Sequence, residues 1–172
     1  MKATLALTFI LLASTFFSSC SKEKFNYQSD YDKSYHVWQA FKSNSHNSYR
    51  YKVVSGSWIG TSWQTVITVT NGKVTQRYYK HTAPTNFPSS SQQEWTEDES
   101  HLDTHPQSGA LPIWTLDDIY EKAKIDWLQK RDDATTYFET KNNGMISNCG
   151  YVPNSCADDC FRGITITLIE AL

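Results

Sequence analysis

The chain has 172 residues, with 16 basic and 18 acidic side chains and a formal net charge of −2 at pH 7. That length suits one domain with a single hydrophobic core. Because the charge is near neutral and Lys and Arg form no stripe, the composition argues against a nucleic-acid partner. Aromatic residues make up 14% of the chain, several at alternating positions, which indicates a folded domain containing strands.

Residues 1–20 have the layout of an export signal. Lys2 supplies a positive charge, an apolar run covers residues 5–17, and Ser18 and Ser19 lead into Cys20. The run is too short to span a bilayer, and no later run approaches the ~20 residues of a spanning helix. With cysteine at the cleavage point, the segment resembles a bacterial lipoprotein signal. The alternative is an ordinary secretory signal in which Cys20 is incidental.

The lipoprotein resemblance implies that Cys20 is acylated, as by palmitate, and becomes the first mature residue. It predicts a signal peptide over 1–19, a lipidated tether over 20–29 and a single domain over 30–172. Ser21 stands where an inner-membrane retention signal has Asp, so the resemblance favours the outer membrane, facing the periplasm. The tether lacks the acidic run that some lipoproteins use for surface display, and exposure on the cell surface is left open.

The first part of the domain combines a helical pattern with strand patterns. Aromatic residues between positions 31 and 41 recur three or four apart, which predicts a helix. Apolar and charged residues alternate over 49–53, and the side chains at every second position over 63–69 predict a second strand. Residues 73–80 are predicted to form its return strand. Asn71-Gly72 lies between the last two and predicts a tight hairpin, because both turn positions require positive φ.

Residues 81–112 are predicted to form one long loop. The stretch contains several prolines and a run of Ser and Gln. Loops of this length in compact domains are usually functional or mobile. Trp95 and Leu102 are its expected anchors on the core.

The second part of the domain repeats the order of helix and strands. Thr115 is expected to begin a helix whose apolar face extends to Trp127. Strands are predicted over 136–140, 145–148 and 163–169, with a cysteine loop before the last. The order α-βββ-α-βββ predicts an α+β fold, in which an antiparallel sheet of about six strands carries two helices on one face.

The long loop contains a candidate metal site. His101 and His105 are four residues apart, a spacing that places both imidazoles on one side of a helix, as zinc sites often require. Glu99 and Asp103 are the nearest further ligands, and Glu97 and His81 are alternatives. The competing interpretation is a solvated polar loop that binds no cofactor.

Three cysteines lie near the C-terminus, at positions 149, 156 and 160. Outside the cytosol, such a cluster tends to oxidise, and the odd count predicts one disulfide and one remaining thiol. Spacing alone does not show which two of Cys149, Cys156 and Cys160 pair. A zinc site or a reactive thiol is the alternative, although no Cys-x-x-Cys motif is present.

Aromatic residues on and near the predicted strands are the candidate binding surface. Trp58, Trp63, Tyr78 and Tyr79 are placed there, because helices on one side of the sheet leave the other side free for a partner. The sequence lacks a Gly-x-Ser-x-Gly elbow and a glycine-rich phosphate loop. It therefore favours binding over catalysis.

Four short motifs in the domain are similar to those of a family of small bacterial lipoproteins that contain a domain of unknown function. The resemblance extends over most of residues 35–170, and the motifs are Ser48-Tyr-Arg-Tyr51, Val69-Thr-Asn-Gly-Lys-Val74, Thr115-Leu-Asp-Asp-Ile-Tyr120 and Asn143-Gly144. The family has no established activity, so the resemblance implies no catalytic residues.

These observations predict a membrane-anchored domain in the cell envelope that binds an envelope protein or a small ligand. Two other functions are kept as alternatives. One is a metal- or thiol-dependent activity at His101 and His105 or at the cysteine loop. The other is inhibition of an envelope hydrolase, which rests on analogy with other compact lipoproteins.

Overall fold

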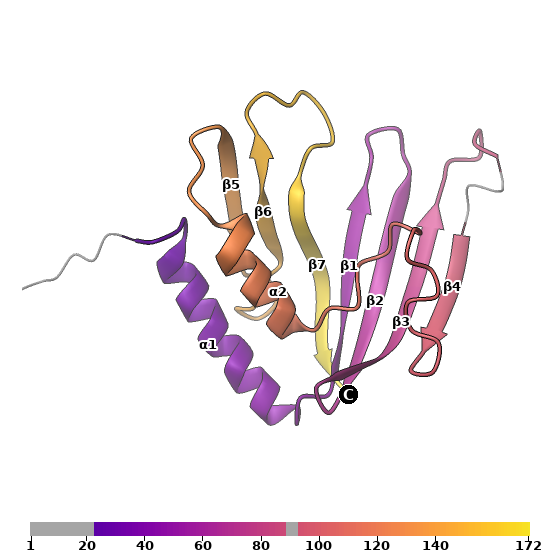
Figure 1. The fold of residues 1–172 in the computed structure, drawn as a ribbon, viewed down its shortest axis with the longest axis horizontal. Helices are drawn as coiled ribbons and strands as arrows, with labels where there is room; N and C mark the ends of the chain where they lie inside the picture. Colours follow the sequence, from indigo (N-terminus) through magenta and orange to yellow (C-terminus); the bar gives the residue numbers. More distant parts are fainter. Residues whose placement is uncertain (1–22, 89–92) are drawn as a thin grey trace, which may run out of the picture.

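A computed structural model of the protein describes residues 23–88 and 93–172 (Figure 1). The predicted signal peptide and Cys20 lie outside these residues. The described chain forms one antiparallel sheet of seven strands, in the order β4-β3-β2-β1-β7-β6-β5. Both helices lie on the same side of this sheet (Figure 1). The predicted α+β class and antiparallel sheet are therefore confirmed.

The N-terminal part of the domain follows its sequence patterns closely. It contains helix α1 (Gln28–Asn44) and strands β1 (Tyr49–Gly56), β2 (Ser62–Thr70) and β3 (Lys73–Thr82). Asn71 and Gly72 have φ of 50° and 81°, which confirms the predicted hairpin. Phe25, inside the predicted tether, is buried in the core, so the folded domain includes part of that segment.

The predicted count of about six strands and the order α-βββ-α-βββ were wrong, because the expected loop over 81–112 contains strand β4 (Gln93–Asp98). In β4, Trp95 lies opposite Tyr79 of β3, and Glu97 lies opposite Arg77. The sequence pattern did not indicate this strand, because one of its two inward-facing side chains, Glu97, is a carboxylate. A buried ion pair at this place leaves no hydrophobic alternation in the sequence.

Helix α2 (Leu116–Lys122) begins at Thr115, as predicted, and continues as the π-helical turn η2 (Ala123–Trp127). Its start is a capping box. The Thr115 hydroxyl accepts from the Asp118 N–H, and the Asp118 carboxylate accepts from the Thr115 N–H at 2.7 Å. The cap fixes the residue at which the helix begins, and therefore the position of the preceding residue, Trp114, relative to the sheet.

The last three strands are β5 (Ala134–Glu139), β6 (Asn148–Pro153) and β7 (Arg162–Ala171). The predicted strand over 145–148 and the assignment of Cys149 to a loop were wrong, because Cys149 lies inside β6. Gly150 of this strand is required for packing, since a Cβ there would lie 2.6 Å from the Phe161 ring.

The core lies between the helices and the sheet and is rich in aromatic rings. Trp38 of α1 packs edge-on against Tyr49 of β1, with ring centroids 5.1 Å apart. The Tyr49 hydroxyl accepts from the Leu116 N–H at 3.0 Å, and the Tyr51 hydroxyl donates to the Trp114 carbonyl at 2.6 Å. These buried hydroxyls therefore hold the segment before α2 against the sheet.

Candidate binding cleft at the fork of the sheet

The sheet divides between β1 and β7 into two arms. One arm consists of β4, β3, β2 and β1, and the other of β7, β6 and β5. β1 and β7 pair only at one end, where Tyr49–Val53 face Ile166–Ala171, with a register shift between Lys52 and Val53. Beyond that point residues 54–56 pair only with β2, and residues 162–165 pair only with β6. The arms separate there, as the gap between β1 and β7 in Figure 1 shows. We call this region the fork.

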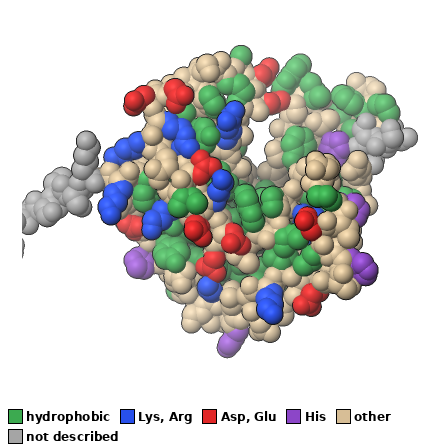
Figure 2. Space-filling view, in the orientation of Figure 1, with side chains coloured by type: hydrophobic (Ala, Val, Ile, Leu, Met, Phe, Trp, Pro, Cys, Tyr) green, Lys and Arg blue, Asp and Glu red, His purple; other side chains and the backbone are tan. Residues whose placement is uncertain are grey.

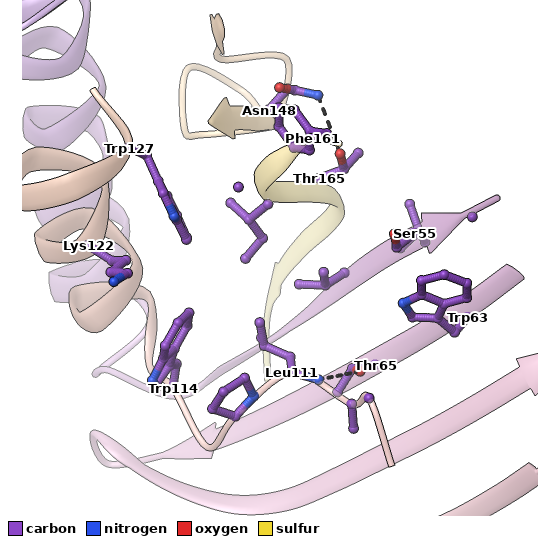
Figure 3. Close-up of a pocket in the computed structure, with 18 of the residues that line it drawn as sticks. Ser55, Trp63, Thr65, Leu111, Trp114, Lys122, Trp127, Asn148, Phe161 and Thr165 are labelled. Atoms are coloured by element: carbon purple, nitrogen blue, oxygen red, sulfur yellow. Dashed lines mark hydrogen bonds between the residues drawn. The ribbon is translucent and has the colours of Figure 1, made fainter. Parts of the chain in front are cut away.

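A cleft of about 610 Å³ lies at the fork, a volume within the usual range for small-molecule sites. Figure 2 shows the molecule hollowed on this side, with hydrophobic side chains at the bottom. Figure 3 shows Trp114 and Trp127 on one side of the cleft, Trp63 on the other, and Phe161 at one end. Four aromatic rings therefore line one cavity.

One wall of the cleft comes from the segment between β4 and α2. The Leu111 N–H donates to the Thr65 hydroxyl at 3.0 Å, and Arg77 donates to the Leu111 carbonyl at 3.2 Å. Trp114 then packs near Trp127, with ring centroids 6.3 Å apart. Bonds to two strands thus position this wall over the sheet.

Glu97 anchors the earlier part of the same segment. Its carboxylate accepts two bonds from Arg77, at 2.8 and 3.0 Å, and backbone N–H bonds from Asp103 and His105. The side chains of Arg77 and Glu97 are only 2% and 1% exposed. Burial opposes ionisation, but these bonds outweigh it and lower the pKa of Glu97 to about 2. Glu97 is therefore an ionised, buried anchor for the cleft wall.

A side-chain bond bridges the far end of the fork. Ser57, in the turn after β1, donates to the Asp159 carboxylate at 2.6 Å. Asp159 belongs to the loop that the disulfide between Cys156 and Cys160 closes. The disulfide therefore constrains the residue that joins the two arms.

Polar side chains line the cleft beside the aromatic rings, among them Lys122 and Asn148. The Asn148 amide donates to the Thr165 hydroxyl at 3.3 Å, as Figure 3 shows. Its side-chain oxygen is buried and has no hydrogen-bond partner among the described residues. Asp159 is the one carboxylate among the described residues that line the cavity, and it already bonds Ser57. An aromatic cavity with directional polar groups is suited to binding.

The four residues of the predicted binding surface do not form one surface. Trp63 lines the cleft, and Trp58, 74% exposed, lies in the turn between β1 and β2. Tyr79 is buried and stacks on Trp95, whereas Tyr78 points to the other side of the sheet and bonds Glu94. The aromatic cavity is therefore at the fork and not on the free face of the sheet.

The two histidines of the predicted metal site bond different carboxylates. His101 bonds the Asp98 carboxylate at 3.0 Å, and His105 bonds Glu97 at 3.0 Å while stacking on Trp95. No helix joins the two histidines; Glu99 is exposed, and Asp103 pairs with Arg77. Within residues 23–88 and 93–172, no group of three or more His, Cys, Asp and Glu side chains is arranged to hold a metal ion.

The cysteines form one disulfide, between Cys156 and Cys160, and leave Cys149 as a thiol. Cys149 is fully buried in the core beneath the helices. Burial raises the pKa of the Cys149 thiol well above its usual value. Because the nucleophile is the thiolate, Cys149 has the properties of a structural residue.

The sequence patterns missed the residues that complete the cleft. Trp127 was predicted on the apolar face of its helix, and in the structure it contacts the core and also lines the cleft. Trp114 and Phe161 belonged to no sequence pattern. The signal for Trp114 was its position just before the Thr115 cap.

Comparisons with protein-family models, curated proteins and solved structures find no match to this chain.

Proposed function

We propose that this chain is a bacterial lipoprotein, anchored through Cys20, whose domain binds a ligand in the cleft at the fork. The cleft carries the binding part of the proposal, because four aromatic rings converge in one cavity together with polar side chains that can orient a ligand. The anchor rests on the arrangement of residues 1–20 and on the resemblance to a lipoprotein signal. With Ser21 after the cysteine, the proposed location is the outer membrane, facing the periplasm.

The anchor is tested by labelling cells with an alkyne analogue of palmitate. The wild-type protein is expected to incorporate the label and to sediment with outer-membrane vesicles, whereas Cys20→Ala is expected to do neither. Cys149→Ser is the matched control, because it removes a buried cysteine of the domain and leaves the signal unchanged. Equal labelling of wild type and Cys20→Ala would refute acylation at this residue.

The cleft is tested with the fluorescent probe 1-anilinonaphthalene-8-sulfonate, an aromatic sulfonate small enough for the cavity. We expect saturable binding to the folded protein and a loss of about tenfold or more in affinity in Trp63→Ala, since large aromatic contacts dominate such sites. Trp58→Ala is the control, because Trp58 is an exposed tryptophan that does not line the cleft. Equal effects of the two substitutions would place the probe elsewhere.

A further inference from the structure

The fork contains two strand edges without a strand partner. Residues 54–56 of β1 pair with β2 on one side only, and residues 162–165 of β7 pair with β6 on one side only. In an antiparallel strand, the backbone N–H and C=O groups alternate between the two sides. Each edge therefore presents backbone donors and acceptors toward the fork, where no ladder pair joins these described residues to each other.

We infer that the ligand of the cleft is an extended peptide segment that adds as a strand to one of these two edges. The inference rests on the proposed binding function and names its ligand class. Free strand edges are templates for another strand, and proteins use them to bind peptides through main-chain hydrogen bonds. Residues of both edges line the cleft, Val54, Ser55 and Gly56 on β1 and Gly163, Ile164 and Thr165 on β7, so a peptide in the cleft lies beside an unpaired backbone edge.

The cleft matches the side chains of such a peptide as well as its backbone. Successive side chains of a strand point to opposite sides, so alternate peptide residues would enter the cavity that Trp63 lines on one side and Trp114 and Trp127 line on the other. The buried Asn148 oxygen, which has no partner among the described residues, offers an acceptor for a peptide N–H. The free edges span three or four residues, which is about 10–14 Å of extended chain.

A saccharide is the main competing ligand class. Its ring can stack on the same tryptophans, but it does not have the regular alternation of donors and acceptors that a strand edge requires. The bridge from Ser57 to Asp159 also limits the occupant, because it ties the arms at their far end. A short segment is therefore favoured over a long strand that passes through the fork.

The test uses the full acylated protein in detergent micelles and blocked hexapeptides in which Val and Thr alternate around a central Phe, Leu or Ala. We expect at least one peptide to bind saturably and to displace the anilinonaphthalene probe. Methylation of alternate peptide nitrogens is expected to weaken binding by about tenfold, because each lost hydrogen bond is uncompensated. Amide exchange is expected to slow within residues 54–56 or 162–165, a change that binding through side chains alone would not cause.

Three results would overturn strand addition. In the first, peptides bind but methylation and amide exchange show no effect. In the second, a trimer of N-acetylglucosamine displaces the probe and no peptide does. In the third, the probe binds in the cleft and neither class displaces it. All three leave the cleft as a binding site, whereas the proposed function itself fails only if the probe does not depend on Trp63.

Discussion

At the scale of single residues, Glu97 is the polar group on which the cleft wall depends most. It pairs with buried Arg77, accepts from the backbone of residues 103 and 105, and lies beside the stacked rings of Trp95 and His105. The Arg77 guanidinium is also 5.3 Å from the Trp95 ring centroid. Removal of one partner from such a pair leaves an uncompensated buried charge.

Glu97→Gln is therefore expected to lower the free energy of unfolding by about 3 kcal/mol, because Arg77 stays buried without its counter-ion. Urea unfolding followed by circular dichroism measures this change. Glu94→Gln is the matched control, since Glu94 pairs with Lys80 at 2.9 Å on the exposed side of the sheet, where ion pairs contribute little. Equal unfolding midpoints for the two variants would contradict the anchoring role of Glu97.

The lowered pKa of Glu97 also predicts how stability depends on pH. Its pKa is about 2 in the folded chain against a usual 4.5, so the unfolded chain binds the proton more strongly. The ionised carboxylate then contributes about 3 kcal/mol above pH 4.5, and this contribution is lost as the pH falls toward 2. Unfolding of wild type and Glu97→Gln between pH 7 and 2.5 measures it. The prediction fails if the gap between the two proteins does not narrow as the pH falls.

At the scale of elements, the loop between β6 and β7 joins the two arms of the fork. It carries Phe161, whose ring covers Gly150 and Gly163, and Asp159, which bonds Ser57. The disulfide closes a small ring within this loop. By the chain-entropy account, a ring of this size contributes about 2 kcal/mol, so its main effect is local.

This pairing predicts the reactivity of the three cysteines of the domain. In denaturant without reductant, a thiol reagent is expected to modify one cysteine of the domain, Cys149, and to leave Cys156 and Cys160 unmodified. In the native protein the reaction is expected to be slow, because Cys149 is buried and its pKa is raised. Peptide mapping identifies the modified residue. Modification of all three cysteines would refute the disulfide.

At the scale of the whole molecule, the sheet consists of two arms held together at one end. The β1–β7 ladder joins them over residues 49–53, and the aromatic core beneath α1 and α2 covers that junction. Beyond it, the Ser57–Asp159 bond bridges the arms. The two arms are therefore expected to differ in local stability along their length.

Native amide exchange tests this expectation in the protein without ligand. Segments covering residues 54–57 and 162–165 are expected to exchange faster than those covering 49–53 and 166–171, because alternate amides at the fork have no strand partner. Residues 64–68, in the middle of β2, are the protected control because they pair on both sides. Uniform protection along β1 and β7 would show that the fork is closed in solution.

Local sequence patterns were sufficient for much of the fold. The spacing of aromatic residues predicted α1, the side chains at every second position over 63–69 predicted β2, and Asn71-Gly72 predicted the turn into β3, because each signal depends on neighbours close in the chain. The pattern failed at β4 and β6. There, Glu97 and Cys149 are buried by partners far away in the sequence, Arg77 in one case and the helices in the other.

The sequence by itself determined the α+β class, the hairpin at Asn71-Gly72 and the odd number of cysteines in the C-terminal cluster. Only the tertiary structure decided which side chains come together to form the cleft. The cleft combines Trp63 from β2, Trp114 from the segment before α2, and Phe161 from the loop before β7. These residues meet because β1 and β7 stop pairing after Val53, and strand pairing between the two ends of the chain has no signature in local sequence.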